Sequence, residues 1–132
     1  MKLIVQKFGG TSVRDRDRIF NVAKIITDTY KEGNNVIAVV SAQGDTTDDL
    51  IAKAEEINPN ASKREMDMLL STGEQISASL LAMAIESMGF PVISLSGRQA
   101  GFVTDSNYSR ARIKKLETER LEKELDKRRI VI

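Results

Sequence analysis

The chain has 132 residues, enough for one domain, and its 41% hydrophobic and 30% charged residues are typical of a soluble globular protein. The 20 Lys and Arg residues against 19 Asp and Glu residues leave a formal net charge of +1, which gives no support to nucleic-acid or membrane binding as the main function. Because the sequence contains neither Cys nor His, it excludes disulfides, thiol nucleophiles, His-ligated metals and Ser-His-Asp triads. Catalysis must therefore use other side chains or backbone amides.

The N-terminus shows no signal peptide, because the apolar run after Lys2 is short and enters a Gly-rich turn. No stretch approaches the roughly 18 to 20 apolar residues of a membrane span. We therefore expect a cytoplasmic protein with neither a membrane nor a nucleic acid as its partner.

The first half of the chain alternates between strand and helix patterns. Residues 3–5 favour a strand, and the apolar positions after them recur at helical spacing up to Gly33, which stands where a helix C-cap belongs. Ser12 or Asp15 is the predicted N-cap of this helix. The apolar run 36–40 has no polar alternation, which indicates a strand covered on both faces. A second helical pattern follows that run.

The second half begins with the longest helical pattern, over residues 62–88. The remaining segments are a strand over 91–95, a loop-like stretch over 96–112, an ambiguous segment over 113–116, an amphipathic helix over 118–127 and a last apolar run over 130–132. Strands that alternate with helices predict an α/β domain with a mainly parallel sheet, and residues 1–132 contain no repeat or linker that would divide it.

The last apolar run, residues 130–132, begins as a buried strand, and the sequence stops inside it. Strands typically have five or six residues. We therefore expect the chain to be the front part of a longer protein, and we expect the run to leave an unpaired sheet edge exposed.

The segment between the first strand and the first helix is a candidate phosphate site. Its glycines let the backbone turn sharply and let an anion approach the amides, and a helix N-terminus stands behind them. The candidate residues are Lys7, Phe8, Gly9, Gly10, Thr11 and Ser12. The segment is not a Walker A loop, because the Lys precedes the glycines. The alternative is a tight turn with an exposed Lys.

Residues 41–48 form the second junction between a strand and a helix. In an open parallel sheet, ligands bind at the carboxyl ends of the strands, so both junctions should open on one edge. Thr46 and Thr47 could hydrogen-bond a polar ligand, or they could cap the next helix.

Glu74 follows Gly73 inside the longest helical pattern. A central Gly costs roughly 1 kcal/mol relative to Ala, which favours either a close backbone approach or a local break that opens the helix to a ligand. A carboxylate beside such a break could pair with a substrate ammonium group, whereas the alternative is a surface Glu beside a packing Gly. Arg98, in a Gly-flanked loop, could reach an anion or could be a solvated loop residue.

Taken together, the motifs resemble the aspartate kinase family over the whole chain. They are KFGGTS at 7–12, VVSA at 39–42 with Gly44 and TTD at 46–48, STGE at 71–74, and QAG at 99–101 with ARI at 111–113. The resemblance implies the amino acid kinase fold, a three-layer α/β/α sandwich with a mainly parallel sheet, truncated here at its C-terminal side. It also implies transfer of the ATP γ-phosphoryl group to the β-carboxylate of L-aspartate, the entry step to lysine, threonine and methionine.

The resemblance also implies roles for particular residues. Lys7 would be catalytic and, with Gly9 and Gly10, would hold the transferring phosphoryl group. The substrate aspartate would be bound by Ser41, Thr46, Thr47 and Glu74.

The family's cofactors are ATP and Mg²⁺. By the resemblance, the nucleotide-binding half, most of the metal site and the ACT regulatory domains lie beyond residue 132. We expect the full-length protein to be a homo-oligomer and the fragment alone to be inactive.

Two other interpretations stay open. The first is another amino acid kinase, acting on glutamate, acetylglutamate or carbamate, although the pair of motifs KFGGTS and STGE favours aspartate. The second is a non-catalytic α/β module that binds a small anion or dimerises.

Overall fold

The computed structural model describes all residues from 1 to 132. Four strands form one sheet in the order β1-β2-β6-β3, and every neighbouring pair in it is parallel. This confirms the predicted α/β fold. The elements are β1 (Leu3–Phe8), a 3₁₀ turn (Gly10–Val13), α1 (Arg16–Lys31), β2 (Asn35–Val40), α2 (Thr46–Ile57), α3 (Lys63–Ser87), β3 (Val92–Ile93), β4 (Phe102–Thr104), β5 (Ile113–Leu116), α4 (Glu119–Asp126) and β6 (Ile130–Val131).

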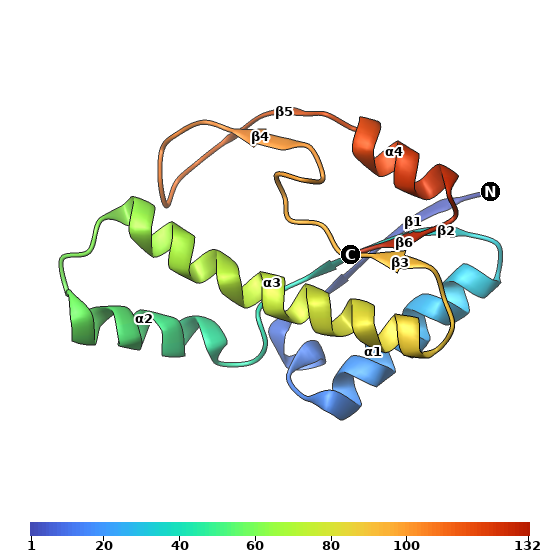
Figure 1. Cartoon of the computed structure of the whole chain (residues 1–132), viewed down its shortest axis with the longest axis horizontal. Coiled ribbons are helices and arrows are strands. Elements are labelled where there is room, and N and C mark those ends of the chain that lie inside the picture. Colours follow the sequence, from blue (N-terminus) through green and yellow to red (C-terminus); the bar gives the residue numbers. More distant parts are fainter.

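Helices α1 and α3 pack on one face of the sheet (Figure 1). Helix α1 begins where predicted, because the Asp15 carboxylate accepts a hydrogen bond of 3.0 Å from the Arg18 amide, and it is followed by Gly33 at φ +91. The apolar faces of the two helices and the sheet form the main core, a cluster of Val13, Ile19, Val22, Ala23, Ile26, Val36, Ala38, Ala78, Leu81, Ala82, Ala84, Ile85, Ile130 and Ile132.

Helix α4 packs against the other face of the sheet at β6, and the β4–β5 hairpin lies on the same side of the molecule as α4 (Figure 1). Leu125 and Val131 are buried on this side, outside the main core. Leu3, Val5 and Val39 remain 53%, 60% and 46% exposed, so this second layer covers only part of the sheet. The α/β/α layering is therefore present, with one thick layer and one thin layer.

The predicted exposed edge at residues 130–132 is wrong. Strand β6 lies between β2 and β3, and Ile130, Val131 and Ile132 are all buried. The edges of the sheet are instead β1 and β3. Crossover connections place late strands between early ones in parallel sheets, so the order along the chain does not reveal the order across the sheet.

The loop predicted over residues 96–112 contains a strand. Strand β4 pairs with β5 in an antiparallel hairpin, with an irregularity in register between Val103 and Thr104. Both strands are short, and every residue of β5 is exposed. A hairpin without a buried face has no alternation of apolar and polar residues, which is the pattern that identifies strands.

Helix α3 is, by length and composition, apolar enough to cross a membrane, contrary to the sequence prediction that no such stretch exists. Leu81 and Ile85 of this helix are fully buried in the main core against α1 and the sheet. Burial in the core therefore accounts for part of its apolar character, whereas Met68, Ile76 and Met83 are exposed.

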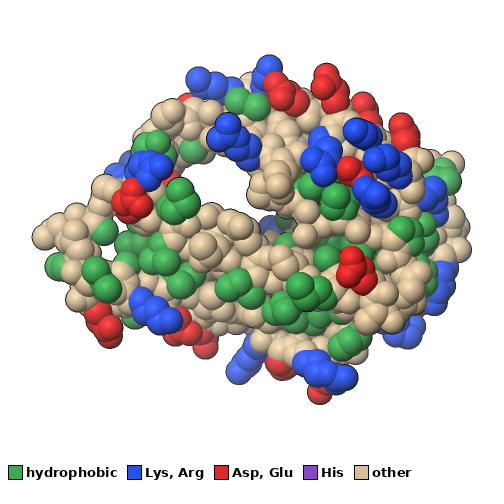
Figure 2. All heavy atoms as spheres, in the orientation of Figure 1, with side chains coloured by type: hydrophobic (Ala, Val, Ile, Leu, Met, Phe, Trp, Pro, Cys, Tyr) green, Lys and Arg blue, Asp and Glu red, His purple; other side chains and the backbone are tan.

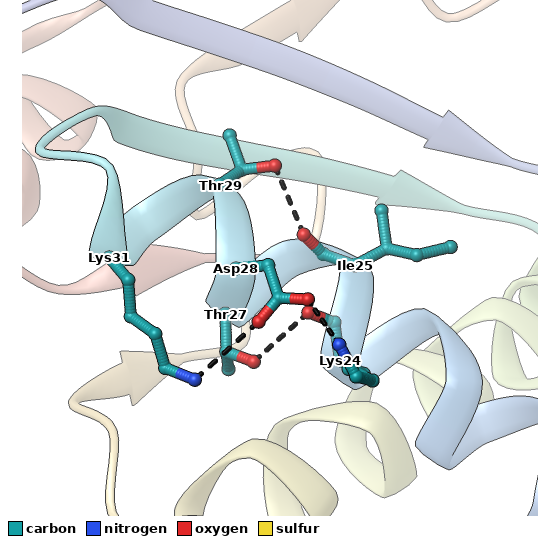
Figure 3. A network of polar contacts seen from close by, with 6 residues as sticks. All are labelled: Lys24, Ile25, Thr27, Asp28, Thr29 and Lys31. Carbon is teal, nitrogen blue, oxygen red and sulfur yellow. Dashed lines mark hydrogen bonds and ion pairs between the residues drawn. The ribbon is translucent and has the colours of Figure 1, made fainter.

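The solvent face of α1 carries a network of polar contacts that stabilises the helix (Figure 3). The Asp28 carboxylate bonds the ammonium groups of Lys24 and Lys31, and the hydrogen bond from Lys24 above all holds the pKa of Asp28 below its usual range. Thr29 in turn accepts a bond of 2.9 Å from the Gln6 amide, which ties β1 to α1. The Lys24, Asp28 and Lys31 side chains satisfy one another, whereas the Gln6 Oε1 atom is buried without a hydrogen-bond partner.

Gly101 closes the base of the hairpin, and we expect Gly101→Ala to lower the free energy of unfolding by about 2–5 kcal/mol. Its φ is +100, and an added Cβ would stand 1.8 Å from the Glu117 carbonyl oxygen. Denaturant unfolding measures the loss. Gly97→Ala is the matched control, because a Cβ added at Gly97 would meet no atom within 4 Å. Equal stability of the two variants would contradict the prediction.

Glu124 joins α4 to the turn before β6, and its side chain is only 4% exposed. Arg129 at 2.6 Å and Arg120 at 2.9 Å bond its carboxylate, and Arg129 contributes most to holding the pKa of Glu124 below its usual range. Because folding lowers its pKa, the Glu124 carboxylate stabilises the fold at any pH above its unfolded-state pKa. This stabilisation is lost as the pH falls through its folded-state pKa. We therefore expect Glu124→Gln to be less stable than the parent at pH 7, with the difference shrinking below about pH 4. Unfolding measured across pH tests this, and a constant difference would contradict it.

Candidate functional site

The loops that follow β1 and β2 meet at the carboxyl edge of the sheet. The Gly44 amide donates to the Gly10 carbonyl at 3.0 Å, and the Ser41 amide donates to the Phe8 carbonyl at 3.3 Å. The Gln43 side-chain amide also donates to the Val13 carbonyl at 2.9 Å. These bonds confirm that the two junctions open on the same edge.

The two glycines of the first loop have different surroundings. An added Cβ on Gly10 would lie 2.6 Å from the Ala42 carbonyl oxygen, so Gly10 permits the close approach of the two loops. Gly9 is exposed, has an extended backbone at φ −76, and would meet no atom within 4 Å. The open side of the loop is therefore at Gly9, where an anion can approach.

Lys7 and Phe8, the last two residues of β1, point to opposite faces of the sheet. Phe8 packs against the main core, whereas Lys7 lies on the same face as Val5 and is exposed. The Lys7 ammonium takes part in none of the ion pairs of the chain. Lys7 therefore presents a cation beside the loop, while Phe8 can offer a ligand only its backbone.

Helix α3 reaches the second loop through small residues. It is continuous from Lys63 to Ser87, so the predicted break at Gly73 is wrong. The other predicted reason for this glycine, a close approach of the backbone, is confirmed. An added Cβ on Gly73 would lie 3.0 Å from the Ala42 Cβ and 3.5 Å from the Thr46 Cγ2. One turn later, the Ser77 hydroxyl donates to the carbonyl of the loop's first residue at 2.6 Å.

Glu74, the residue after Gly73, is exposed on α3. Gly73 packs against Ala42 and Thr46, so the backbone of Glu74 adjoins the second loop. Thr46 and Thr47 are the first residues of α2 and are half-buried, and no side chain caps that helix. The capping alternative therefore does not account for the two threonines.

Arg98 follows β3, so it leaves the sheet at the same carboxyl edge as the other two loops. It is exposed in the loop after β3, in a turn held by two bonds between Ser96 and Gln99, of 3.0 and 3.2 Å. No hydrogen bond or ion pair connects Arg98 to the other two loops. Its role in binding stays a prediction.

A groove of about 370 Å³ beside the first loop contains residues that the sequence analysis missed. Thr11 and Ser12 form one wall of this groove, and the other lining residues are Phe8, Arg18, Asn21, Val22 and Ile25. The last four recur at intervals of three, four and seven residues from Arg18, the spacing of one helix face, which could have revealed them. The Arg18 guanidinium is bonded to the Asp15 carboxylate at 3.0 Å.

The residues of the site do not fit a metal ion by themselves. No group of three or more His, Cys, Asp or Glu side chains lies close enough to hold one. Mg²⁺ prefers carboxylates together with substrate phosphates. The candidate residues thus supply the Lys7 cation, hydroxyls, backbone amides and the Glu74 carboxylate, a set suited to holding charged small molecules.

The sequence of this chain is similar to those of bacterial aspartokinases. The aspartokinases of Bacillus sp. (strain MGA3) and Geobacillus stearothermophilus are 52% and 50% identical to this chain over all 132 residues. The chain spans about a third of the length of these relatives, 32% in each case.

Solved structures show the same fold. The aspartate kinase of Synechocystis has a TM-score of 0.84 at 45% identity, covering 98% of this chain and 21% of that chain. UMP kinase from Ureaplasma parvum, at 17% identity, a TM-score of 0.66 and coverage of 100% of this chain and 55% of that chain, shares the fold alone. The sequence profile of the amino acid kinase family matches residues 2–132. The chain therefore belongs to the amino acid kinase family.

Proposed function

We propose that this chain forms the amino-acid-binding part of an aspartate kinase, which transfers the γ-phosphoryl group of ATP to the β-carboxylate of L-aspartate. The observation that carries the proposal is the junction of three segments at the carboxyl edge, where Gly10, Ala42 and Gly73 are in close contact. The relatives at about 50% identity that are named aspartokinases support it.

The first loop supplies the phosphoryl-binding part of the proposed site. Lys7 brings an unpaired cation, and Gly9 leaves its side of the loop open. Thr11 and Ser12 add hydroxyls that border the groove next to it. Positive charge and amides held in place before the reaction are the groups that stabilise a phosphoryl group in transfer.

The second loop and α3 supply the proposed aspartate site. Thr46 and Thr47 offer hydroxyls at the start of α2, and Ser41 is half-buried at the start of the loop. Glu74 offers a carboxylate to the substrate ammonium group. Together they would orient the substrate so that its β-carboxylate faces the first loop.

The chemistry needs no general base on the protein. A carboxylic acid has a pKa near 4, so the acceptor is already an anion at pH 7. The protein must hold donor and acceptor in line and neutralise the phosphoryl oxygens. A chain without His is sufficient for these tasks.

ATP and Mg²⁺ complete the proposal. By the resemblance to aspartate kinases, Mg²⁺ would bind mainly outside these residues. We therefore expect this chain alone to show no turnover. The longer protein, meaning this chain within a protein of the relatives' length, would be a cytoplasmic homo-oligomer without nucleic-acid or membrane partners.

A coupled ADP-release assay on the longer protein tests the function. We expect ADP release that depends on aspartate and is at least tenfold slower with glutamate, acetylglutamate or carbamate. A preference for one of these would assign the protein to another amino acid kinase activity. Loss of any response to amino acids or phosphate, in turnover and in calorimetric binding, would favour a non-catalytic module.

A further inference from the structure

The β4–β5 hairpin crosses an opening beside the candidate site. It extends from the loop after β3 and reaches over to the N-terminal half of α3 (Figure 1). In the space-filling view the space between the hairpin and α3 stays open (Figure 2). The loop after β3 leaves the carboxyl edge of the sheet, so the opening adjoins the edge where the candidate site lies.

The Asp67 side chain bonds the tip of the hairpin to α3. The Ser109 amide donates to Asp67 Oδ2 at 2.8 Å, and the Ser109 hydroxyl donates to Asp67 Oδ1 at 3.3 Å. Both carboxylate oxygens are therefore used by a residue 42 positions away. Ser109 has a φ of +67, a backbone conformation that residues other than Gly rarely adopt. The two bonds to Asp67 hold Ser109 in this conformation.

The rest of the hairpin has little else to hold it. At its base, the Glu117 amide donates to the Gly101 carbonyl at 2.8 Å. Within the tip, the Asp105 carboxylate accepts bonds from the amides of Asn107 and Arg112, so the turn keeps its own shape. A two-stranded hairpin is at best marginally stable by itself. The contacts with α3 therefore decide where the tip lies. They are the two bonds to Asp67 and an interaction between Arg64 of α3 and Tyr108 beside Ser109.

Asp67 and Glu74 lie on the same side of α3. They are seven residues apart, which is two turns of an α-helix and a distance of about 10 Å along its axis. The hairpin thus meets α3 on the side of the helix that carries the candidate ammonium ligand.

We propose that Asp67 is a positioning residue that latches the hairpin across the opening and thereby sets the access and affinity of the amino acid substrate. The identity of that substrate rests on the proposed function, whereas the latch itself does not. Release of the latch leaves the catalytic groups in place and changes only the segment that encloses them.

Tryptic cleavage tests the latch without any measurement of activity. Arg110 and Arg112 are exposed in the tip, and a protease that cuts slowly reports the fraction of molecules in which the tip is open. We expect Asp67→Ala to speed cleavage at these two sites about tenfold, and Asp67→Asn, which keeps one acceptor, to have a smaller effect. Glu86→Ala, which removes an exposed carboxylate from the same helix, is the matched control.

Kinetics of the longer protein test the positioning role. We expect Asp67→Ala to raise KM for aspartate about tenfold with kcat and KM for ATP within twofold of the parent, and Asp67→Asn to restore part of the affinity. Cleavage of Asp67→Ala within twofold of the parent would overturn the latch. Faster cleavage with an unchanged KM for aspartate would overturn the positioning role. A parent that lacks aspartate-dependent turnover would instead refute the proposed function, and the cleavage comparison would still decide the latch.

Discussion

Lys7→Ala is expected to lower kcat of the longer protein by about 10²- to 10³-fold, with a smaller effect on KM for aspartate. Lys7 is exposed beside the open Gly9 loop and has no ion-pair partner within the chain, so its charge is available to the phosphoryl oxygens. The charge on these oxygens shifts in the transition state, and for this reason the loss appears mainly in kcat. Steady-state ADP release measures it.

Lys2→Ala is the matched control for this prediction. Lys2 directly precedes the same strand and is also exposed, but it lies at the opposite end of β1 from the candidate site. We expect Lys2→Ala to keep kcat within twofold of the parent. A kcat of Lys7→Ala within the same twofold range would contradict the catalytic role.

Glu74→Gln is expected to raise KM for aspartate ten- to a hundredfold and to leave KM for ATP unchanged. The substitution removes a charge and keeps the shape, and a hydrogen bond to a charged group contributes roughly 1.5–3 kcal/mol. The packing of Gly73 against Ala42 and Thr46 holds the Glu74 backbone beside the second loop. Because the Glu74 side chain is exposed, we expect the variant to fold normally.

Glu86→Gln controls for the loss of a carboxylate from α3, since Glu86 is exposed near the other end of the same helix. Both KM values of this control should match the parent. If Glu74→Gln raised KM for ATP as much as KM for aspartate, Glu74 would be structural or linked to the nucleotide.

Much of the local structure could be predicted from the sequence, because helix and strand periods and caps depend on neighbouring residues. The N-cap at Asp15, the glycine at position 33 and the strand around Ala38 are such features, although this strand is buried on one face only and Val39 on the other face is exposed. The carboxyl-edge location of the site follows from the same patterns, because parallel strands end on one side. Two residues of the proposed site, Gly9 and Gly10, look alike in the sequence, although only Gly10 is required by a close contact.

Other features depend on which distant segments meet, and no local pattern encodes this. The last strand lies inside the sheet because the chain returns between β2 and β3, whereas its sequence shows only that it is apolar. Gly73 packs against Ala42, which lies in the loop before α2. The contact between Asp67 and Ser109 joins two polar residues that are ordinary in their own segments. The sequence by itself thus determined the helices and the strands of the main sheet, the class of fold and the candidate residues, since these follow from local periodicity, capping and motifs, whereas the hairpin strands β4 and β5 were not predicted. Strand order, the reason for each glycine and the position of the hairpin were decided only by tertiary structure, because they arise from packing between segments far apart in the chain.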